Sequence, residues 1–75
     1  MDDTLGTVET EGVVKSILGN NNYQVEVEHN NETLRVLCHL SGKMRRYKIS
    51  ITAGDTVRVV IPPPYDKGRI TFREK

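Results

Sequence analysis

Several residue types on which small proteins rely are scarce or absent in this sequence. It contains no tryptophan, three tyrosines, one phenylalanine and a single cysteine, Cys38. A lone cysteine excludes an internal disulfide framework and indicates a reducing compartment. No apolar run approaches the roughly 18 residues of a membrane span. The acidic start Met1-Asp2-Asp3 lacks the basic and apolar regions of a signal peptide. These absences predict a cytoplasmic protein.

Residues with catalytic or metal-binding chemistry are present, but their spacing suits neither purpose. Cys38, His39 and His29 lack the paired spacing of a zinc site. Gly42-Lys43 is not part of a phosphate-binding P-loop, because no glycine stands five residues earlier and Met44 replaces the required serine or threonine. A chain of 75 residues also forms a core too small for a long substrate pocket. We therefore predict a protein that is not an enzyme and uses no cofactor, metal ion or small-molecule substrate.

Charge is divided unevenly along the chain. Residues 1–34 hold seven acidic residues and one basic residue, for a net charge of −6. Residues 35–75 hold ten basic and three acidic residues, for a net charge of +7, and the two parts give the total of +1. A folded chain divided in this way should have one basic side, and such asymmetry indicates a polyanionic partner.

Alternation of apolar and polar residues, which is typical of half-buried strands, dominates the sequence. It predicts strands over residues 8–18, 23–28, 34–40, 57–61 and 69–73. Turns are expected at Gly19-Asn20-Asn21-Asn22 and Asn30-Asn31, because glycine and asparagine tolerate positive φ. Pro62-Pro63-Pro64 must end the fourth strand, since proline donates no ladder hydrogen bond. Residues 41–48 break the alternation and are expected to contain one short helical turn, capped by Ser41.

Five short strands with a connector after the third predict an all-β protein. Its expected architecture is a five-stranded Greek-key OB-fold barrel with a short helical turn or loop between strands 3 and 4. An SH3-like barrel is the structural alternative, but it usually places its helical turn before the last strand. Met44 and Tyr23 are expected to be buried, and Arg69 and Arg73 to share the outer face of the fifth strand. The inward set predicted to form the core is Val25, Val27, Val36, Cys38, Val57, Val59, Ile70 and Phe72.

Two basic segments indicate the kind of partner. Residues 39–46 contain Lys43, Arg45 and Arg46 directly after an alternating apolar run, and residues 67–73 contain three more cations. Clustered cations neutralise phosphates and release counterions, so nucleic acid is the leading candidate. Tyr47 and Tyr65 flank these segments and are candidates to stack on bases. A platform of several exposed aromatic residues, which general single-strand binders need, is lacking. The pattern therefore favours folded RNA, recognised by shape and phosphate.

The chain resembles the bacterial translation initiation factor 1 family from Glu11-Gly12-Val13-Val14 to Arg73, which is nearly its whole length. The specific parts are His39-Leu40-Ser41-Gly42-Lys43-Met44-Arg45, Ile49-Ser50-Ile51 with Gly54-Asp55-Thr56-Val57, and Tyr65-Asp66 followed by Lys67-Gly68-Arg69-Ile70-Thr71-Phe72-Arg73.

This resemblance implies a single OB-fold (S1-like) RNA-binding domain over residues 1–75. It further implies a monomer that binds the A site of the small (30S) ribosomal subunit through 16S ribosomal RNA, beside a ribosomal protein. There it would block premature A-site transfer RNA binding and cooperate with the other two initiation factors. Carried to matching positions, the resemblance implies RNA contacts from Lys43, Arg45, Lys67, Arg69 and Arg73. His39 and Tyr65 are further candidates, and Arg46 joins them as the last cation of its segment.

The chain departs from the family pattern in three places. Asp66 and Lys67 are adjacent, whereas family members usually have two residues between the corresponding positions. Tyr47 stands one position early, and Ser50 replaces an expected arginine, for which Lys48 is a candidate substitute from another face.

Two other functions stay open. One is a general single-stranded RNA-binding chaperone of the cold-shock type, which would not prefer ribosomal subunits over free strands. The other is a protein–protein adaptor that uses the acidic surface of residues 2–32, whose binding would be insensitive to salt and nuclease.

Overall fold

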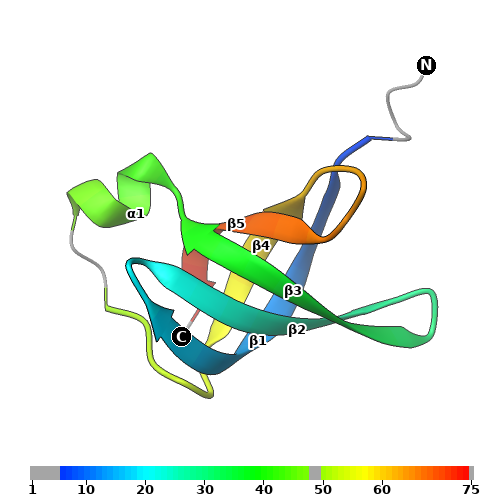
Figure 1. The fold of residues 1–75 in the computed structure, drawn as a ribbon, viewed down its shortest axis with the longest axis horizontal. Coiled ribbons are helices and arrows are strands. Elements are labelled where there is room, and N and C mark those ends of the chain that lie inside the picture. The colour runs from blue at the N-terminus through cyan, green and yellow to red at the C-terminus, as the bar shows by residue number, and fades with distance from the viewer. Residues whose placement is uncertain (1–5, 48–49, 75) are drawn as a thin grey trace.

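The computed structural model describes residues 6–47 and 50–74, so predictions that concern Asp2, Asp3, Lys48 and Ile49 lie outside the described residues. Five strands form a closed barrel in the order β1-β2-β3-β5-β4 (Figure 1). They are β1 (Val8–Gly19), β2 (Asn22–His29), β3 (Glu32–Leu40), β4 (Thr56–Ile61) and β5 (Lys67–Glu74), and the helix α1 (Gly42–Arg46) lies between β3 and β4. The predicted all-β OB-fold barrel, with its helical turn after the third strand, is confirmed.

Strand pairing closes the barrel through neighbours that are distant in sequence. Antiparallel pairs join β1 to β2, β2 to β3, β4 to β5 and β1 to β4, while β3 and β5 run parallel. Among the described strands, closure leaves no long unpaired sheet edge. No helix among the residues described is long and apolar enough to span a membrane.

Asparagine pairs make both tight hairpins, as predicted. Asn20 and Asn21 have φ of 53° and 63°, and Asn30 and Asn31 have φ of 55° and 64°. Two consecutive residues with positive φ give a turn whose twist matches that of the flanking strands. The second turn sets the β2–β3 register, in which Glu26 lies opposite Arg35. This hairpin extends to the end of the molecule farthest from α1 (Figure 1).

The barrel interior contains the predicted core residues with one exception. Val25, Val27, Val36, Cys38 and Ile70 are at most 2% exposed, and Tyr23 and Met44 are buried as well. The full buried set is Val14, Tyr23, Val25, Val27, Val36, Cys38, Leu40, Met44, Ile51, Val57, Val59, Ile61 and Ile70.

Phe72 is the exception, and its predicted burial is wrong. The β4–β5 register pairs Val59 with Ile70 but Arg58 with Phe72, so Thr71 is an extra residue that forms a β-bulge. A one-residue insertion reverses which side chains face inward beyond it. Phe72 therefore points outward and is 58% exposed. The same bulge makes the predicted shared face of Arg69 and Arg73 wrong, because Arg73 pairs with the buried Val57.

Candidate nucleic-acid interface

The short helix α1 is held against one end of the barrel by contacts outside itself. Ser41 is its N-cap, and the Ser41 Oγ accepts a hydrogen bond from the Met44 N–H at 3.2 Å. The Ser41 N–H donates to the Ile70 carbonyl of β5 at 2.9 Å. Met44 lies in the core with 2% exposure. Because a helix of one turn is not stable alone, these contacts determine where its cations lie.

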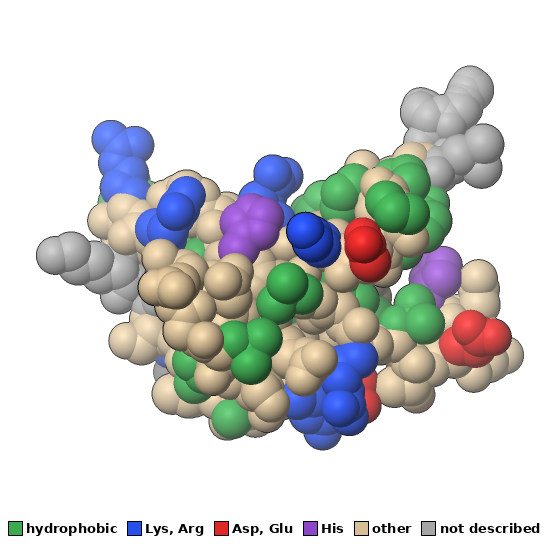
Figure 2. Space-filling model, in the orientation of Figure 1, with side chains coloured by type: hydrophobic (Ala, Val, Ile, Leu, Met, Phe, Trp, Pro, Cys, Tyr) green, Lys and Arg blue, Asp and Glu red, His purple; other side chains and the backbone are tan. Residues whose placement is uncertain are grey.

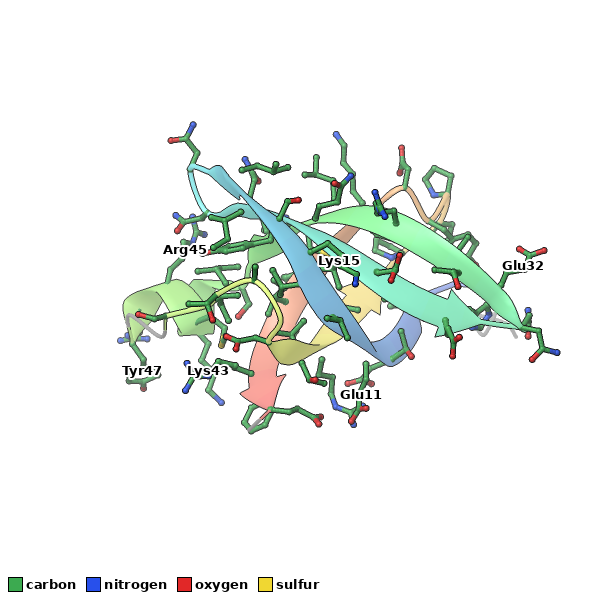
Figure 3. All side chains as sticks on the ribbon, turned by 90° about the horizontal axis from the view of Figure 1, so that it is seen from below. Glu11, Lys15, Glu32, Lys43, Arg45 and Tyr47 are labelled. Atoms are coloured by element: carbon green, nitrogen blue, oxygen red, sulfur yellow. The ribbon has the colours of Figure 1, made fainter. Side chains whose placement is uncertain are left out.

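The three cations of α1 extend from the helix in different directions. Lys43, Arg45 and Arg46 are all exposed. Figure 3 shows Arg45 on the side of the β1–β2 turn, Lys43 on the opposite side of the helix, and Tyr47 at its far end. Arg45 also lines an open hollow of about 400 Å³ together with Asn21 and Ser50. The helix therefore presents positive charge over a wide arc, which suits a curved RNA surface.

A second group of charges lies beside α1 on the parallel pair β3–β5. His39 is directly opposite Arg69, and Lys67 is opposite Leu37, with all four side chains exposed. Figure 2 shows Lys and Arg side chains with a His between them along the upper edge of the molecule, from α1 towards the start of β5. Together these groups form what we call the basic edge, made of His39, Lys43, Arg45, Arg46, Lys67 and Arg69.

Gly68 allows β5 to approach its neighbours closely within this edge. A Cβ at Gly68 would lie 3.1 Å from the Cys38 Sγ and 3.1 Å from the Val60 carbonyl oxygen. The residue is buried, so protein atoms rather than solvent surround this position. Gly68 thus brings β5 close to β3, which places Lys67 and Arg69 beside Leu37 and His39.

Ion pairs separate the cations into two classes. Between described residues, salt bridges join Lys15 and Arg35 to Glu26, at 3.6 and 3.5 Å. Others join Arg58 to Glu11 and Glu74, at 4.0 and 3.6 Å. All of these cations lie over the acidic strands β1 and β2 or next to them. The lysines and arginines of the basic edge form no ion pair with any described residue, so their charge is available to a phosphate.

Two predicted site residues lie apart from the basic edge. The Arg73 Nη1 donates a hydrogen bond to the Ser50 carbonyl oxygen at 2.7 Å, so this side chain is held against the backbone at Ser50. The Tyr65 hydroxyl donates to the Gly6 carbonyl oxygen at 2.9 Å. Tyr65 also lines an apolar hollow of about 260 Å³ with Leu34 and Ile61, beside the β2–β3 turn at Asn30.

Two titratable groups, Cys38 and Glu74, have a raised pKa, and neither belongs to the basic edge. Burial raises the pKa of the Cys38 thiol to about 11, although a backbone hydrogen bond from Gly68 acts in the opposite direction. A hydrogen bond shared with Glu11 raises the pKa of Glu74. The described residues contain no group of three or more potential metal ligands. The site is therefore suited to binding a polyanion, and Cys38 is not an activated nucleophile.

Comparison with known proteins agrees with this geometry. A family model described as Translation initiation factor 1A / IF-1 matches residues 3–75. The chain belongs to that family. It is accordingly a translation initiation factor with an RNA-binding OB-fold barrel.

Two solved structures resemble this IF-1 family member. The solution structure of translation initiation factor 1 from the Wolbachia endosymbiont strain TRS of Brugia malayi is 36% identical, with a TM-score of 0.67, over 99% of this chain and 85% of that one. The crystal structure of YjeQ from Thermotoga maritima is 32% identical, with a TM-score of 0.69, over 91% of this chain. The chain spans only 23% of the YjeQ chain.

At each position where this IF-1 family chain departs from the expected pattern, a local hydrogen bond or helix cap accommodates the change. The short connection before Lys67 is a tight turn in which the Tyr65 N–H donates to the Pro62 carbonyl at 2.8 Å. Ser50 contributes its backbone carbonyl, which accepts the bond from Arg73. Tyr47 is the C-cap of α1 and is 64% exposed, so it stays available beside the basic edge. The exposure of Phe72 is the feature that sequence reasoning missed, because nothing in the local sequence marks a bulge at Thr71.

Proposed function

We propose that this protein acts in initiation by binding the A site of the small (30S) ribosomal subunit through 16S ribosomal RNA, beside a ribosomal protein. In this proposal residues 1–75 are one RNA-binding domain that acts as a monomer and cooperates with the other two initiation factors. The proposal is supported mainly by one observation: in this IF-1 family chain, the described lysines and arginines without an ion pair, apart from Arg73, lie together on one edge of the barrel. Such cations bind phosphates and release counterions.

The mechanism requires occupancy rather than chemistry. The basic edge binds ribosomal RNA phosphates, Arg73 holds the backbone at Ser50, and the barrel body fills the A site. Elongator transfer RNA is excluded while the protein is bound. The acidic strands β1 and β2, whose hollow is lined by Glu11, Glu26 and Glu28, would be repelled by RNA, so they favour the orientation in which α1 faces the subunit.

A pair of matched triple variants tests the role of the basic edge. Replacing Lys43, Arg45 and Arg46 with alanine removes three unpaired cations. Replacing Lys15, Arg35 and Arg58 with alanine removes the same residue types, but these are paired with glutamates. If each unpaired cation contacts one phosphate, the slope of log K against log salt should fall by roughly two units in the first variant.

The second triple variant should change that slope little, because its cations do not face the RNA. Affinity for purified small subunits is measured by sedimentation over a range of salt concentrations. Equal losses from both triples would contradict the assignment of the RNA-binding surface to the basic edge. Tighter binding to a free single strand than to subunits would favour the RNA chaperone instead.

Competition with transfer RNA tests the site itself. Saturating protein should reduce A-site transfer RNA binding to small subunits and spare the P site. Arg69→Glu should relieve this exclusion by placing a negative charge against phosphate. Chemical probing of 16S ribosomal RNA should show protection at the decoding centre. Protection confined to other regions, or undisturbed A-site transfer RNA beside saturating protein, would refute the proposed site.

A further inference from the structure

The exposed ring of Phe72 lies outside the hydrophobic core of the barrel. The bulge at Thr71 turns this side chain away from the core, and it is 58% exposed. It is the protein's only phenylalanine. Its exposed aromatic face leaves apolar area in water, which a ligand can cover.

Most neighbours of Phe72 on this outer face are charged. The outward residues of β5 are Lys67 and Arg69 before the bulge and Phe72 and Glu74 after it, so charge along the strand passes from positive to negative at the ring. Arg58 lies directly opposite Phe72 on β4, and its guanidinium is held by Glu11 and Glu74 at 4.0 and 3.6 Å. The ring therefore stands where the basic edge ends and the acidic surface begins.

We propose that Phe72 is a base-stacking residue, on which an unpaired RNA base lies while the adjoining phosphate contacts Arg69. This inference rests on the proposed function, since it adds a contact to the same RNA surface. A flat exposed ring beside an unpaired cation is the arrangement that binds single-stranded bases. The carboxylates of Glu11 and Glu74 repel phosphate on the far side of the ring, which sets the direction from which the strand arrives.

The charged surroundings favour a base over an apolar protein side chain as the occupant. A protein partner that docked on Phe72 would need an apolar patch around the ring. The cross-strand and same-strand neighbours of Phe72 on the outer face are instead Arg58, Arg69 and Glu74, together with the half-buried Val60, which lies opposite Arg69. A base needs only the ring face, and its phosphate uses the neighbouring arginine.

Substitutions that separate ring chemistry from apolar area test this assignment. Phe72→Leu keeps an apolar side chain but removes the aromatic face, and Phe72→Tyr keeps both. Stacking predicts that Phe72→Leu weakens small-subunit binding by about 5- to 140-fold, the range for losing one base–aromatic stack, while Phe72→Tyr binds as tightly as the unsubstituted protein. Equal affinity of Phe72→Leu would overturn the proposal, as would a loss seen only with Phe72→Ala, which indicates an apolar protein contact.

Fluorescence provides a second test that does not depend on the ribosome. The chain contains no tryptophan, so Phe72→Trp introduces a single tryptophan at the ring position, and its fluorescence is followed. A short oligoadenylate at low salt should quench it, and the additional change Arg69→Ala should remove the quenching. Leu18→Trp is the control, because Leu18 is also exposed, at 53%, but lies on β1. Equal quenching at both positions would contradict stacking at Phe72.

The two proposals fail in different ways. If the unsubstituted protein does not bind small subunits, the proposed function is wrong, and the oligoadenylate experiment still decides whether Phe72 stacks. If subunits are bound and the α1 triple variant weakens binding while Phe72→Leu does not, only the stacking inference is wrong.

Discussion

Gly12→Ala should destabilise the barrel by an amount that the structure allows to be worked out. Gly12 lies on β1 opposite Val27 of β2 and Val57 of β4. A Cβ added there would stand 2.6 Å from the Val25 Cγ1, 2.7 Å from the Val27 Cγ1 and 2.9 Å from the Glu26 carbonyl oxygen. Side chains could rotate, but the carbonyl belongs to the β1–β2 ladder. Relief therefore requires β1 and β2 to move apart.

The expected cost follows from two opposing effects. Overpacking of a well-packed interior costs about 1–3 kcal/mol. Loss of glycine freedom in the unfolded chain returns about 0.4–1 kcal/mol. At the midpoints of these two ranges the net loss is about 1.3 kcal/mol, against a total of about 4–11 kcal/mol for a chain of this length. Since 1 kcal/mol shifts the Tm of such a domain by about 4–8 °C, the Tm should fall by roughly 5–10 °C.

Thermal unfolding followed by circular dichroism provides the measurement, and Gly42→Ala is the matched control. No atom lies within 4 Å of a Cβ at Gly42, which opens α1. Alanine is the better helix former by about 0.5–1 kcal/mol, so this variant should be as stable as the unsubstituted protein or more stable. A Gly12→Ala protein that unfolds at the same temperature as Gly42→Ala would refute the close packing of β1 on β2.

Three further predictions concern the helix cap and the two shifted pKa values. Ser41→Ala should cost about 0.5–2 kcal/mol in urea unfolding and also weaken subunit binding, and Ser41→Thr should restore both, because only the side-chain acceptor is lost. Since the pKa of Cys38 is about 11 and the thiol is buried, iodoacetamide should alkylate it far more slowly in native protein than in urea at pH 8; equal rates would contradict its burial. Glu74 has a pKa raised above its ordinary value of 4.5 by the hydrogen bond with Glu11, so its stabilising contribution is complete below 4.5 and is lost as pH rises through the folded-state pKa. Glu74→Gln keeps a hydrogen-bond donor and should make stability less dependent on pH in this window, which chemical denaturation at a series of pH values measures.

Local signals in the sequence predicted the parts of the fold that local chemistry controls. The asparagine pairs require positive φ, and both hairpins formed where they stand. Ser41 supplied a cap at the expected position, and Met44 became buried beneath the helix. The β2–β3 turn also fixes the pairing of Arg35 with Glu26, so the neutralisation of that arginine could have been derived from the sequence.

Features that depend on barrel closure could not be predicted in this way. The bulge at Thr71 arises where β5 pairs with β4, a strand with which the turn signals establish no register. It reversed the expected orientations of Phe72 and Arg73. The pairing of Arg58 with Glu11 likewise requires β1 and β4 to meet, and these strands are far apart in the chain. Sequence reasoning therefore identified the cations of α1 correctly as exposed, but not which other cations are neutralised.

The hydrogen bond from the Ser41 N–H to the Ile70 carbonyl has a consequence for the order of assembly during synthesis. The meander β1-β2-β3 can pair as it leaves the ribosome, because its contacts are local. The contacts that hold α1, however, include this hydrogen bond to β5. That strand is the last of the five to be made, and it must insert between β3 and β4. A nascent chain that ends before Ile70 would carry the cations of α1 without a fixed place for them. We therefore expect newly made chains to gain affinity for the small subunit in a single late step, only after β5 has emerged from the exit tunnel.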